Sequence, residues 1–239
     1  MSRTVGASGA RTAEAIRVAG LQLIYEHGFE AMSLRQLAVM VGLQPASLYN
    51  HMATKQDLLF RIIFQHMRDL IDSTHAALDA DSDATALDRL RRFIAHHLHA
   101  HMQKKREVYV ANFELRALTA PNYESIVAMR EQYERILIDI LDRGVAEGSL
   151  RPIDTPVAAY ALLAMLTGTC TWYKPNGRLS EEQVIAMHTA LVLDGFATPA
   201  KTSLAEAGAT KAGPARAGRP ARRQDSLPVP ARTLKERRR

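Results

Sequence analysis

The chain has 239 residues, of which 47% are hydrophobic, which is enough for one large domain or two modest ones with a buried core. Its longest apolar run, Ala158 to Cys170, is shorter than the ~20 residues that a membrane-spanning helix needs. Cys170 is the single cysteine, which excludes an intramolecular disulfide, and the N-terminus lacks the apolar stretch of a secretory signal. We therefore expect a cytoplasmic protein without a membrane segment.

The net charge of +6 is unevenly distributed along the chain. Residues 201–239 hold 11 Lys and Arg against 3 Asp and Glu, a net charge of +8, which leaves −2 for residues 1–200. Because this end of the chain is rich in Ala, Pro, Gly and Arg and has no apolar periodicity, we predict that residues 200–239 form a disordered basic tail. Such a tail would add salt-sensitive, sequence-independent affinity for DNA.

Apolar positions recur at helical spacing along the chain, and no segment alternates long enough to predict a strand. We predict an all-α protein with a small N-terminal module and a larger helical body. A flexible N-terminus covers residues 1–10, and a first helix covers Arg11 to Gly28, with Gly28 as its C-cap. The helices of the body are expected at about Ala84 to Met102, Lys105 to Leu118, Asn122 to Glu147, Thr155 to Tyr173 and Ser180 to Gly195.

The segment between Ser33 and Leu59 contains two short helices with a glycine and a proline between them. Ser33 opens the first with a capping-box pattern, and Gly42 ends it. Pro45 suits the first turn of the second, which is expected to end near Met52. Two short helices joined by such a tight turn cross one another and form a helix-turn-helix. A helical hairpin that only packs is the alternative interpretation of this bare pattern.

The second helix of this pair is the one whose exposed side chains enter a DNA major groove. These positions mix amide, hydroxyl and aromatic groups, which bond to base edges and phosphates. A capped helix start near Ser33 and a lysine at the start of the following helix supply further phosphate contacts. The residues predicted to contact DNA are Ser33, Arg35, Gln44, Ala46, Ser47, Tyr49, Asn50, His51 and Lys55.

The stretch GFEAMSLRQLAVMVGLQPASLYNHMATKQDLL resembles the DNA-binding domain of the TetR/AcrR family of bacterial transcriptional regulators. The match runs from about Arg11 to Phe60 and includes the Ser47-Leu48-Tyr49 centre, while Met52 stands where the family usually has an aromatic residue. The resemblance implies a helix-turn-helix DNA-binding domain at 11–60, with phosphate contacts from Tyr49 and Lys55. It also implies a C-terminal helical ligand-binding and dimerisation domain at 61–199.

In this family a homodimer binds a palindromic operator in double-stranded DNA, and a small-molecule effector shifts it out of the DNA-binding state. The resemblance therefore implies a repressor with these partners and no cofactor. The family dimerises through its last two helices, and packing within one subunit is the alternative explanation for the apolar residues there. The residues predicted for the dimer interface are Leu162, Leu166, Trp172, Tyr173, Val184, Met187 and Leu191.

Two further stretches, ANFELRALTAPNYESIVAMREQYERIL and LLAMLTGTCTWYKPNGRLS, are similar to TetR-type regulators of lipid and steroid breakdown. Several regulators of that subgroup sense acyl-CoA thioesters, so the resemblance implies an effector such as an acyl-CoA. An acyl chain needs an apolar channel, and the CoA phosphates need Arg or Lys side chains. The residues predicted to line the pocket are Phe93, His97, Phe113, Arg116, Arg130, Leu137 and Met165.

Other functions fit the sequence less well. His97 and His101 lie four residues apart on one helical face and suggest a metal-responsive regulator, but no cysteine or pair of carboxylates completes a site, so we predict no metal. The tail triplet Gly218-Arg219-Pro220 resembles a minor-groove AT-hook with poor flanks, which leaves a purely architectural DNA-binding protein as an alternative. The chain has no G-x-G-x-x-G, P-loop, H-E-x-x-H or G-x-S-x-G motif, so we expect no enzyme.

Overall fold

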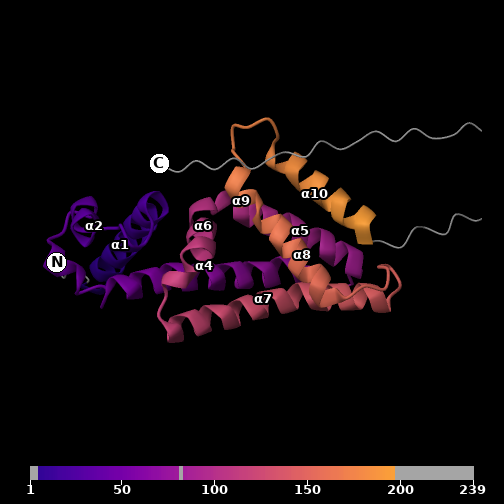
Figure 1. Ribbon diagram of the computed structural model, residues 1–239, viewed down its shortest axis with the longest axis horizontal. Coiled ribbons are helices and arrows are strands. Elements are labelled where there is room, and N and C mark those ends of the chain that lie inside the picture. The colour runs from indigo at the N-terminus through magenta and orange to yellow at the C-terminus, as the bar shows by residue number, and fades with distance from the viewer. Residues whose placement is uncertain (1–4, 81–82, 197–239) are drawn as a thin grey trace, which may run out of the picture. The chain divides into compact units, whose positions relative to one another are not determined.

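The structure, a computed structural model, describes residues 5–80 and 83–196, and the regular secondary structure of this part is helical, as predicted (Figure 1). Within this part of the chain, no helix combines the length and the hydropathy that crossing a membrane requires. The helices are α1 (Val5–His27), α2 (Leu34–Met40), α3 (Pro45–Leu48), α4 (Lys55–Leu78), α5 (Ala86–Gln103), α6 (Lys105–Phe113), the 3-10 turn η1 (Leu115–Ala117), α7 (Ala120–Ala146), α8 (Thr155–Thr167), α9 (Thr169–Trp172) and α10 (Glu181–Phe196).

Short polar side chains determine where several of these helices begin. The Ser33 hydroxyl accepts the backbone N–H of Arg35 at 3.2 Å and starts α2. At the start of α4, the Thr54 hydroxyl accepts the N–H of Asp57 at 3.0 Å, and the Asp57 carboxylate accepts the N–H of Ala53 at 3.0 Å. The bonds from Arg35 and Asp57 each satisfy a backbone donor that the first turn of a helix leaves unpaired, and the bond from Ala53 anchors the residue before the N-cap. The local sequence therefore fixes these helix starts.

The helix ends differ from the prediction in several places. α1 begins at Val5, within the segment that was predicted to be a flexible N-terminus, and α3 ends at Leu48 rather than near Met52. The helix predicted to run from Lys105 to Leu118 ends at Phe113 and continues as η1. The helix predicted to run from Thr155 to Tyr173 is divided into α8 and α9 at Gly168. Inside a helix, a glycine lowers the stability by about 1 kcal/mol relative to alanine, which favours a break at this position.

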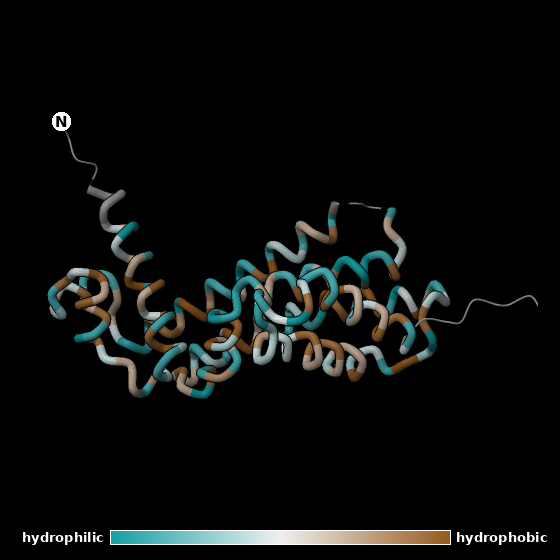
Figure 2. The backbone as a smooth tube through the Cα atoms, turned by 90° about the horizontal axis from the view of Figure 1, so that it is seen from above, coloured by the Kyte–Doolittle hydropathy of each residue, from teal (hydrophilic) through white to brown (hydrophobic). Residues whose placement is uncertain are grey.

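We call α1 to α3 with the first turn of α4 the head, and the remainder of α4 with α5 to α10 the body. α1 packs against α2, α4 and α6, and α5 packs against α4, α7, α8 and α10. α4 runs from the head into the body (Figure 1). Hydrophobic and hydrophilic residues alternate along the helices, as expected for amphipathic helices packed around a core (Figure 2).

The head and the body share one continuous hydrophobic core in the described residues. It extends from Leu37 and Leu48 in the head to Phe93 and Leu137 in the body, and all four side chains are fully buried. The domain boundary predicted after Phe60 falls inside α4, so a rigid helix joins the two parts at this position. The basic tail predicted for residues 200–239, with its AT-hook, lies outside the described residues.

Candidate functional site

The turn between α2 and α3 sets the geometry of the helix-turn-helix. Gly42 ends α2 at φ +69°, a left-handed conformation that favours glycine, and the N–H of Leu43 donates to the Ala38 carbonyl at 2.9 Å. Pro45 then occupies the first turn of α3. Leu48 on α3 and Ala38 on α2 are fully buried, so the two helices pack through small and branched side chains. The opposite side of α3 faces solvent.

Each side chain predicted to contact DNA has access to solvent. Tyr49, at the end of α3, is 57% exposed, and the side chain of Ser33 is occupied by its capping bond. The polar groups around α3 are therefore available to base edges and phosphates. The exposed members of the set are Arg35, Gln44, Ala46, Tyr49 and Asn50, and the half-buried members are Ser33, Ser47, His51 and Lys55.

Two cations of α4 bond to the loops on either side of the helix-turn-helix. The Lys55 ammonium donates to the Glu30 carbonyl at 2.9 Å and lies 4.6 Å from the centroid of the Phe29 ring. The Arg61 guanidinium donates to the His51 carbonyl at 3.1 Å, just after α3. A lysine ammonium has three donors, so Lys55 keeps donors for a phosphate while it holds the loop after α1. The sequence prediction missed Arg61. Its signal was the spacing of four residues from Asp57, which places the two opposite charges next to one another on one helical face.

A cavity of about 410 Å³ lies in the body, within the size range of small-molecule sites. Its walls come from α4 to α9, and they combine apolar side chains with a smaller number of polar groups. Such a surface suits an apolar ligand that carries a few hydrogen-bonding groups. The lining residues are His66, Met67, Leu70, His97, His101, Ala111, Asn112, Phe113, Arg130, Tyr133, Glu134, Tyr160, Leu163, Ala164, Thr167, Gly168, Cys170 and Thr171.

The structure brings only part of the predicted pocket together. His97, Phe113 and Arg130 line the cavity. Phe93 and Leu137 are fully buried but point into the core, where the Phe93 ring lies 5.5 Å from the Tyr133 ring. Helical periodicity identifies the buried face of a helix but does not say which part of that face borders a cavity. The predicted residues that do not line the cavity are Phe93, Arg116, Leu137 and Met165.

Three buried histidines form part of the cavity wall. His97 is bonded through both ring nitrogens, to the Tyr133 hydroxyl at 2.9 Å and to the Thr167 hydroxyl at 3.2 Å. The Nδ1 of His101 donates to the His97 carbonyl at 2.8 Å, and the two rings stack with centroids 3.7 Å apart. Burial lowers the pKa of His66 to about 4 and that of His101 to about 3, and it holds the pKa of His97 well below its ordinary value. These imidazoles are therefore neutral at pH 7.

This arrangement does not favour a metal site. Both nitrogens of His97 are already bonded, and no group of three or more His, Cys, Asp or Glu in residues 5–80 and 83–196 is placed to hold a metal ion. Cys170 also borders the cavity, where burial raises the pKa of its thiol. The metal-responsive alternative thus has no ligand set in the described part of the chain.

Arg130 connects the cavity wall to the end of α6. Its guanidinium donates to the Ala111 carbonyl at 2.8 Å and to the Asn112 side-chain oxygen at 3.2 Å. Burial lowers the pKa of Arg130, but a guanidinium stays protonated in proteins. Arg130 therefore places a positive charge at the cavity and ties α7 to α6.

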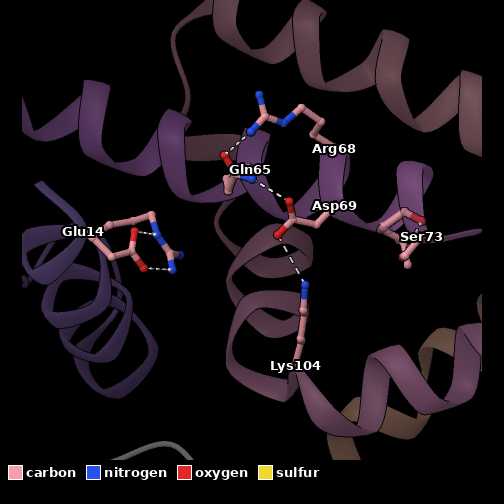
Figure 3. A network of polar contacts seen from close by, with 8 residues as sticks. Glu14, Gln65, Arg68, Asp69, Ser73 and Lys104 are labelled. Atoms are coloured by element: carbon pink, nitrogen blue, oxygen red, sulfur yellow. Dashed lines mark hydrogen bonds and ion pairs between the residues drawn. The ribbon is translucent and has the colours of Figure 1, made fainter. Parts of the chain in front are cut away.

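Both ends of α6 are also tied to α4. At its start, the Lys104 ammonium lies 3.4 Å from the Asp69 carboxylate, which also accepts the Gln65 amide at 2.5 Å (Figure 3). Beyond its end, the Ala117 carbonyl of η1 accepts the side-chain amide of Gln56 from the first turn of α4. The turn η1, which follows the helix that supplies Ala111 and its neighbours to the cavity, is therefore bonded to the part of α4 that belongs to the head.

The residues predicted for the dimer interface fall into two groups. Trp172, Met187 and Leu191 are exposed, between 50% and 63%. The buried group packs inside one protomer and consists of Leu162, Leu166, Tyr173 and Val184. α8 adds two exposed side chains, Val157 and Tyr160, that the sequence prediction did not include.

The fold and the two sites define a DNA-binding regulator with a small-molecule cavity, and the comparisons with known proteins agree. Residues 16–62 match the family described as bacterial regulatory proteins, tetR family, and residues 83–196 match the tetracyclin repressor-like C-terminal domain. The structure is similar to the TetR family transcriptional regulator PfmR from Thermus thermophilus, with 30% identity and a TM-score of 0.69. That similarity covers 75% of this chain and 97% of PfmR. The chain belongs to the TetR family and is a ligand-responsive, DNA-binding transcriptional regulator.

Two other relatives are regulators as well. The HTH-type transcriptional repressor KstR2 of Mycobacterium tuberculosis is 26% identical over 205 residues, which cover 82% of this chain and 98% of KstR2. The structure of that ketosteroid transcriptional regulator superposes with a TM-score of 0.71. AibR, solved in complex with isovaleryl coenzyme A and operator DNA, is 26% identical with a TM-score of 0.70, over 75% of this chain and 97% of AibR.

Proposed function

We propose that the protein is a homodimeric repressor that binds a palindromic operator and releases it when an acyl-CoA thioester occupies the cavity. The observation that carries this proposal is the cavity itself, because one of its walls is α6, which packs against α1 of the head and continues into η1, where the Ala117 carbonyl accepts the Gln56 amide. The relatives support it: KstR2 is a repressor, and AibR was solved with isovaleryl coenzyme A and operator DNA. Acyl-CoA sensing would connect the protein to the breakdown of lipids or steroids.

The proposal assigns DNA binding to residues 11–60 and effector binding with dimerisation to residues 61–199. In the head, the amides of Gln44 and Asn50 suit the edge of adenine, while Tyr49 and Lys55 suit phosphates. We propose that the protein acts in the cytoplasm, where bacterial operators are, and that it regulates genes rather than catalysing a reaction. The relatives KstR2 and PfmR, both transcriptional regulators, support this second point.

The proposed dimer interface uses exposed apolar side chains of α8 to α10. Val157 and Tyr160 come from α8, Trp172 from α9, and Met187 and Leu191 from α10. Exposed apolar side chains that gather on neighbouring elements mark interaction surfaces. One helix-turn-helix makes few base contacts, so two heads reading half-sites about 34 Å apart, or a multiple of that distance, give the specificity an operator needs.

In the proposed complex the acyl group occupies the cavity, and the positive charge of Arg130 attracts the polar thioester end. A ligand that recruits the Arg130 guanidinium competes with its bonds to Ala111 and Asn112, and so it shifts the end of α6. Gln56 passes that shift to the start of α4. A coupling of about 1–3 kcal/mol between effector and DNA corresponds to about a 5- to 150-fold change in operator affinity.

The test is fluorescence anisotropy with DNA from the region upstream of the protein's own gene and with scrambled DNA of equal length, at two salt concentrations, with and without a panel of acyl-CoA thioesters. We expect sequence-selective binding that a thioester relieves. Arg130→Gln should keep operator binding and lose most of the thioester response. The matched control is Arg116→Gln, because Arg116 is exposed on η1 and does not line the cavity, so it should respond like the unchanged protein.

Truncation at Ala200 separates this function from that of an architectural DNA-binding protein. A sequence-specific regulator keeps its discrimination between operator and scrambled DNA and loses only part of its salt-dependent affinity. Loss of nearly all binding upon truncation would mean that the basic tail, rather than the head, holds the DNA. Selective binding that no thioester alters would refute the effector class and leave the regulator intact.

A further inference from the structure

His66 is a buried polar side chain with one ring nitrogen that has no hydrogen-bond partner in the part of the chain that the structure describes. It lies on the apolar face of α4, between Ile63 and Met67, and its side chain is 5% exposed. Its Nδ1 has no partner among the described residues, although the ring borders the cavity. A buried polar atom left without a hydrogen bond costs about 1–3 kcal/mol, so native structures seldom keep one without a reason.

His101 faces the same cavity with a hydrogen-bond acceptor. Its Nδ1 donates to the His97 carbonyl, which fixes the proton of the neutral ring on that nitrogen. The Nε2 atom then carries a lone pair, and the structure gives it no hydrogen bond within the described residues. Protonation does not remove this lone pair near neutral pH, because burial keeps the ring uncharged. The cavity thus offers an acceptor at His101.

The two rings stand close enough to share one atom of a ligand. The centroids of His66 and His101 lie 6.5 Å apart, with the ring planes at 70°. Each ring nitrogen lies about 1 Å from its centroid, so this spacing leaves room for one oxygen at about 2.9 Å from a nitrogen of each ring that faces the gap. His97 is not available to bond to such an oxygen, because its two ring nitrogens already bond to Tyr133 and Thr167.

We propose that His66 and His101 form a hydroxyl-binding subsite in the cavity wall, so that the buried part of the effector carries a hydroxyl group. A hydroxyl both donates and accepts: it donates to the lone pair of His101 and accepts from His66 when the neutral His66 ring carries its proton on Nδ1. A carbonyl or carboxylate oxygen only accepts and so opposes the lone pair of His101, while a plain hydrocarbon leaves both rings unpaired. The inference rests on the proposed function only in placing the effector in this cavity.

The experiment uses calorimetry to measure the binding of acyl-CoA thioesters in sets of three with equal carbon number. Each set contains a saturated acyl group, its hydroxy form and its oxo form. The position of the oxygen along the acyl group differs from one set to the next. For the unchanged full-length protein we expect at least one hydroxyacyl-CoA to bind about 10-fold more tightly than both of its counterparts. His66→Leu should remove this preference, so that the hydroxy form binds no more tightly than its two counterparts.

Two further variants test whether the preference belongs to this subsite. His66→Gln keeps a donor and an acceptor at the position and should keep part of the preference. His99→Leu is the matched control, because His99 is an exposed histidine on α5 that bonds to Glu181 and does not line the cavity. It should bind all three thioesters as the unchanged protein does.

A second readout does not depend on CoA. Nitrogen-15 NMR of the imidazoles should show shifts at His66 and His101 with benzyl alcohol and much smaller shifts with toluene. If thioesters bind without any preference that His66→Leu removes, the subsite does not exist and the proposed function stands. If only a fixed water fills the gap between the rings, the subsite is likewise overturned and the proposed function stands. If no thioester binds but benzyl alcohol shifts both rings, the effector class fails and the subsite stands. If neither readout responds, both are overturned.

Discussion

The head and the body place their polar side chains in opposite environments. In the head, the side chains predicted to contact DNA surround the buried Leu48 and remain in contact with solvent. In the body, His66, His97 and His101 are buried and face a cavity, and burial removes their charge at neutral pH. A surface that reads DNA can be built from neighbouring residues of one short segment. A cavity has to be assembled from helices that lie far apart in the sequence.

The largest expected effect tests whether the head and the body nevertheless fold together. Phe93→Ala deletes a fully buried ring in the body and should lower the free energy of unfolding by about 3–5 kcal/mol. Because one core runs through both parts, urea denaturation followed by far-UV circular dichroism should show a single transition at lower urea. Phe113→Ala, at an exposed position on the cavity, is the control and should cost much less. Two separate transitions would show that the head folds by itself.

The buried histidines predict a dependence of stability on pH that arises in the body. The pKa of His66 falls from its ordinary 6.5 to about 4 in the folded protein, so the unfolded chain binds the proton more tightly. Stability is therefore complete above pH 6.5 and is lost as the pH falls toward 4, by about 3 kcal/mol for this residue. Thermal unfolding across this range measures the slope.

His66→Leu should make that slope smaller, because the variant has one proton fewer to bind upon unfolding. At neutral pH the variant should be at least as stable as the unchanged protein, since leucine leaves no unpaired polar atom in the apolar wall. An unchanged slope would contradict the burial of a neutral His66.

In the head, Lys55→Ala should weaken operator binding about 10-fold and weaken binding to scrambled DNA by a similar factor. The slope of log affinity against log salt should fall by about one, because one phosphate contact is lost. Effector binding in the cavity should not change. Anisotropy titrations at several salt concentrations measure both effects, and a normal salt slope would mean that the ammonium serves only the Glu30 carbonyl and the Phe29 ring.

The smallest effect concerns the turn of the head. Gly42→Ala places a side chain at φ +69°, where nothing obstructs its Cβ but the backbone conformation itself is unfavourable for alanine. We expect a loss of about 1 kcal/mol in the free energy of unfolding, measured with urea. Gly195→Ala, in α10, also meets open space but lies in a helix, so as the control it should not destabilise the protein.

The sequence predicted the helix-turn-helix well because its signals are local. A capping serine, a glycine in the left-handed turn and a proline in the first helical turn act within a few residues of one another, as Ser33, Gly42 and Pro45 do. The helix break at Gly168 was missed, because a single glycine inside a helical pattern is often tolerated. The sequence also shows that His66 is a polar residue at a core position of α4. It does not show that His66 borders a cavity.

By itself, the sequence determined the all-α class, the helix-turn-helix and the set of exposed polar groups around α3, since short-range spacing controls each of them. The tertiary structure alone decided which buried side chains line the cavity. Phe93 and His97 lie one turn apart on α5, yet one fills the core and the other faces the cavity. It also decided that Leu162 packs inside the protomer while Tyr160 is exposed. These outcomes depend on how distant helices pack against one another, which periodicity along a single helix does not encode.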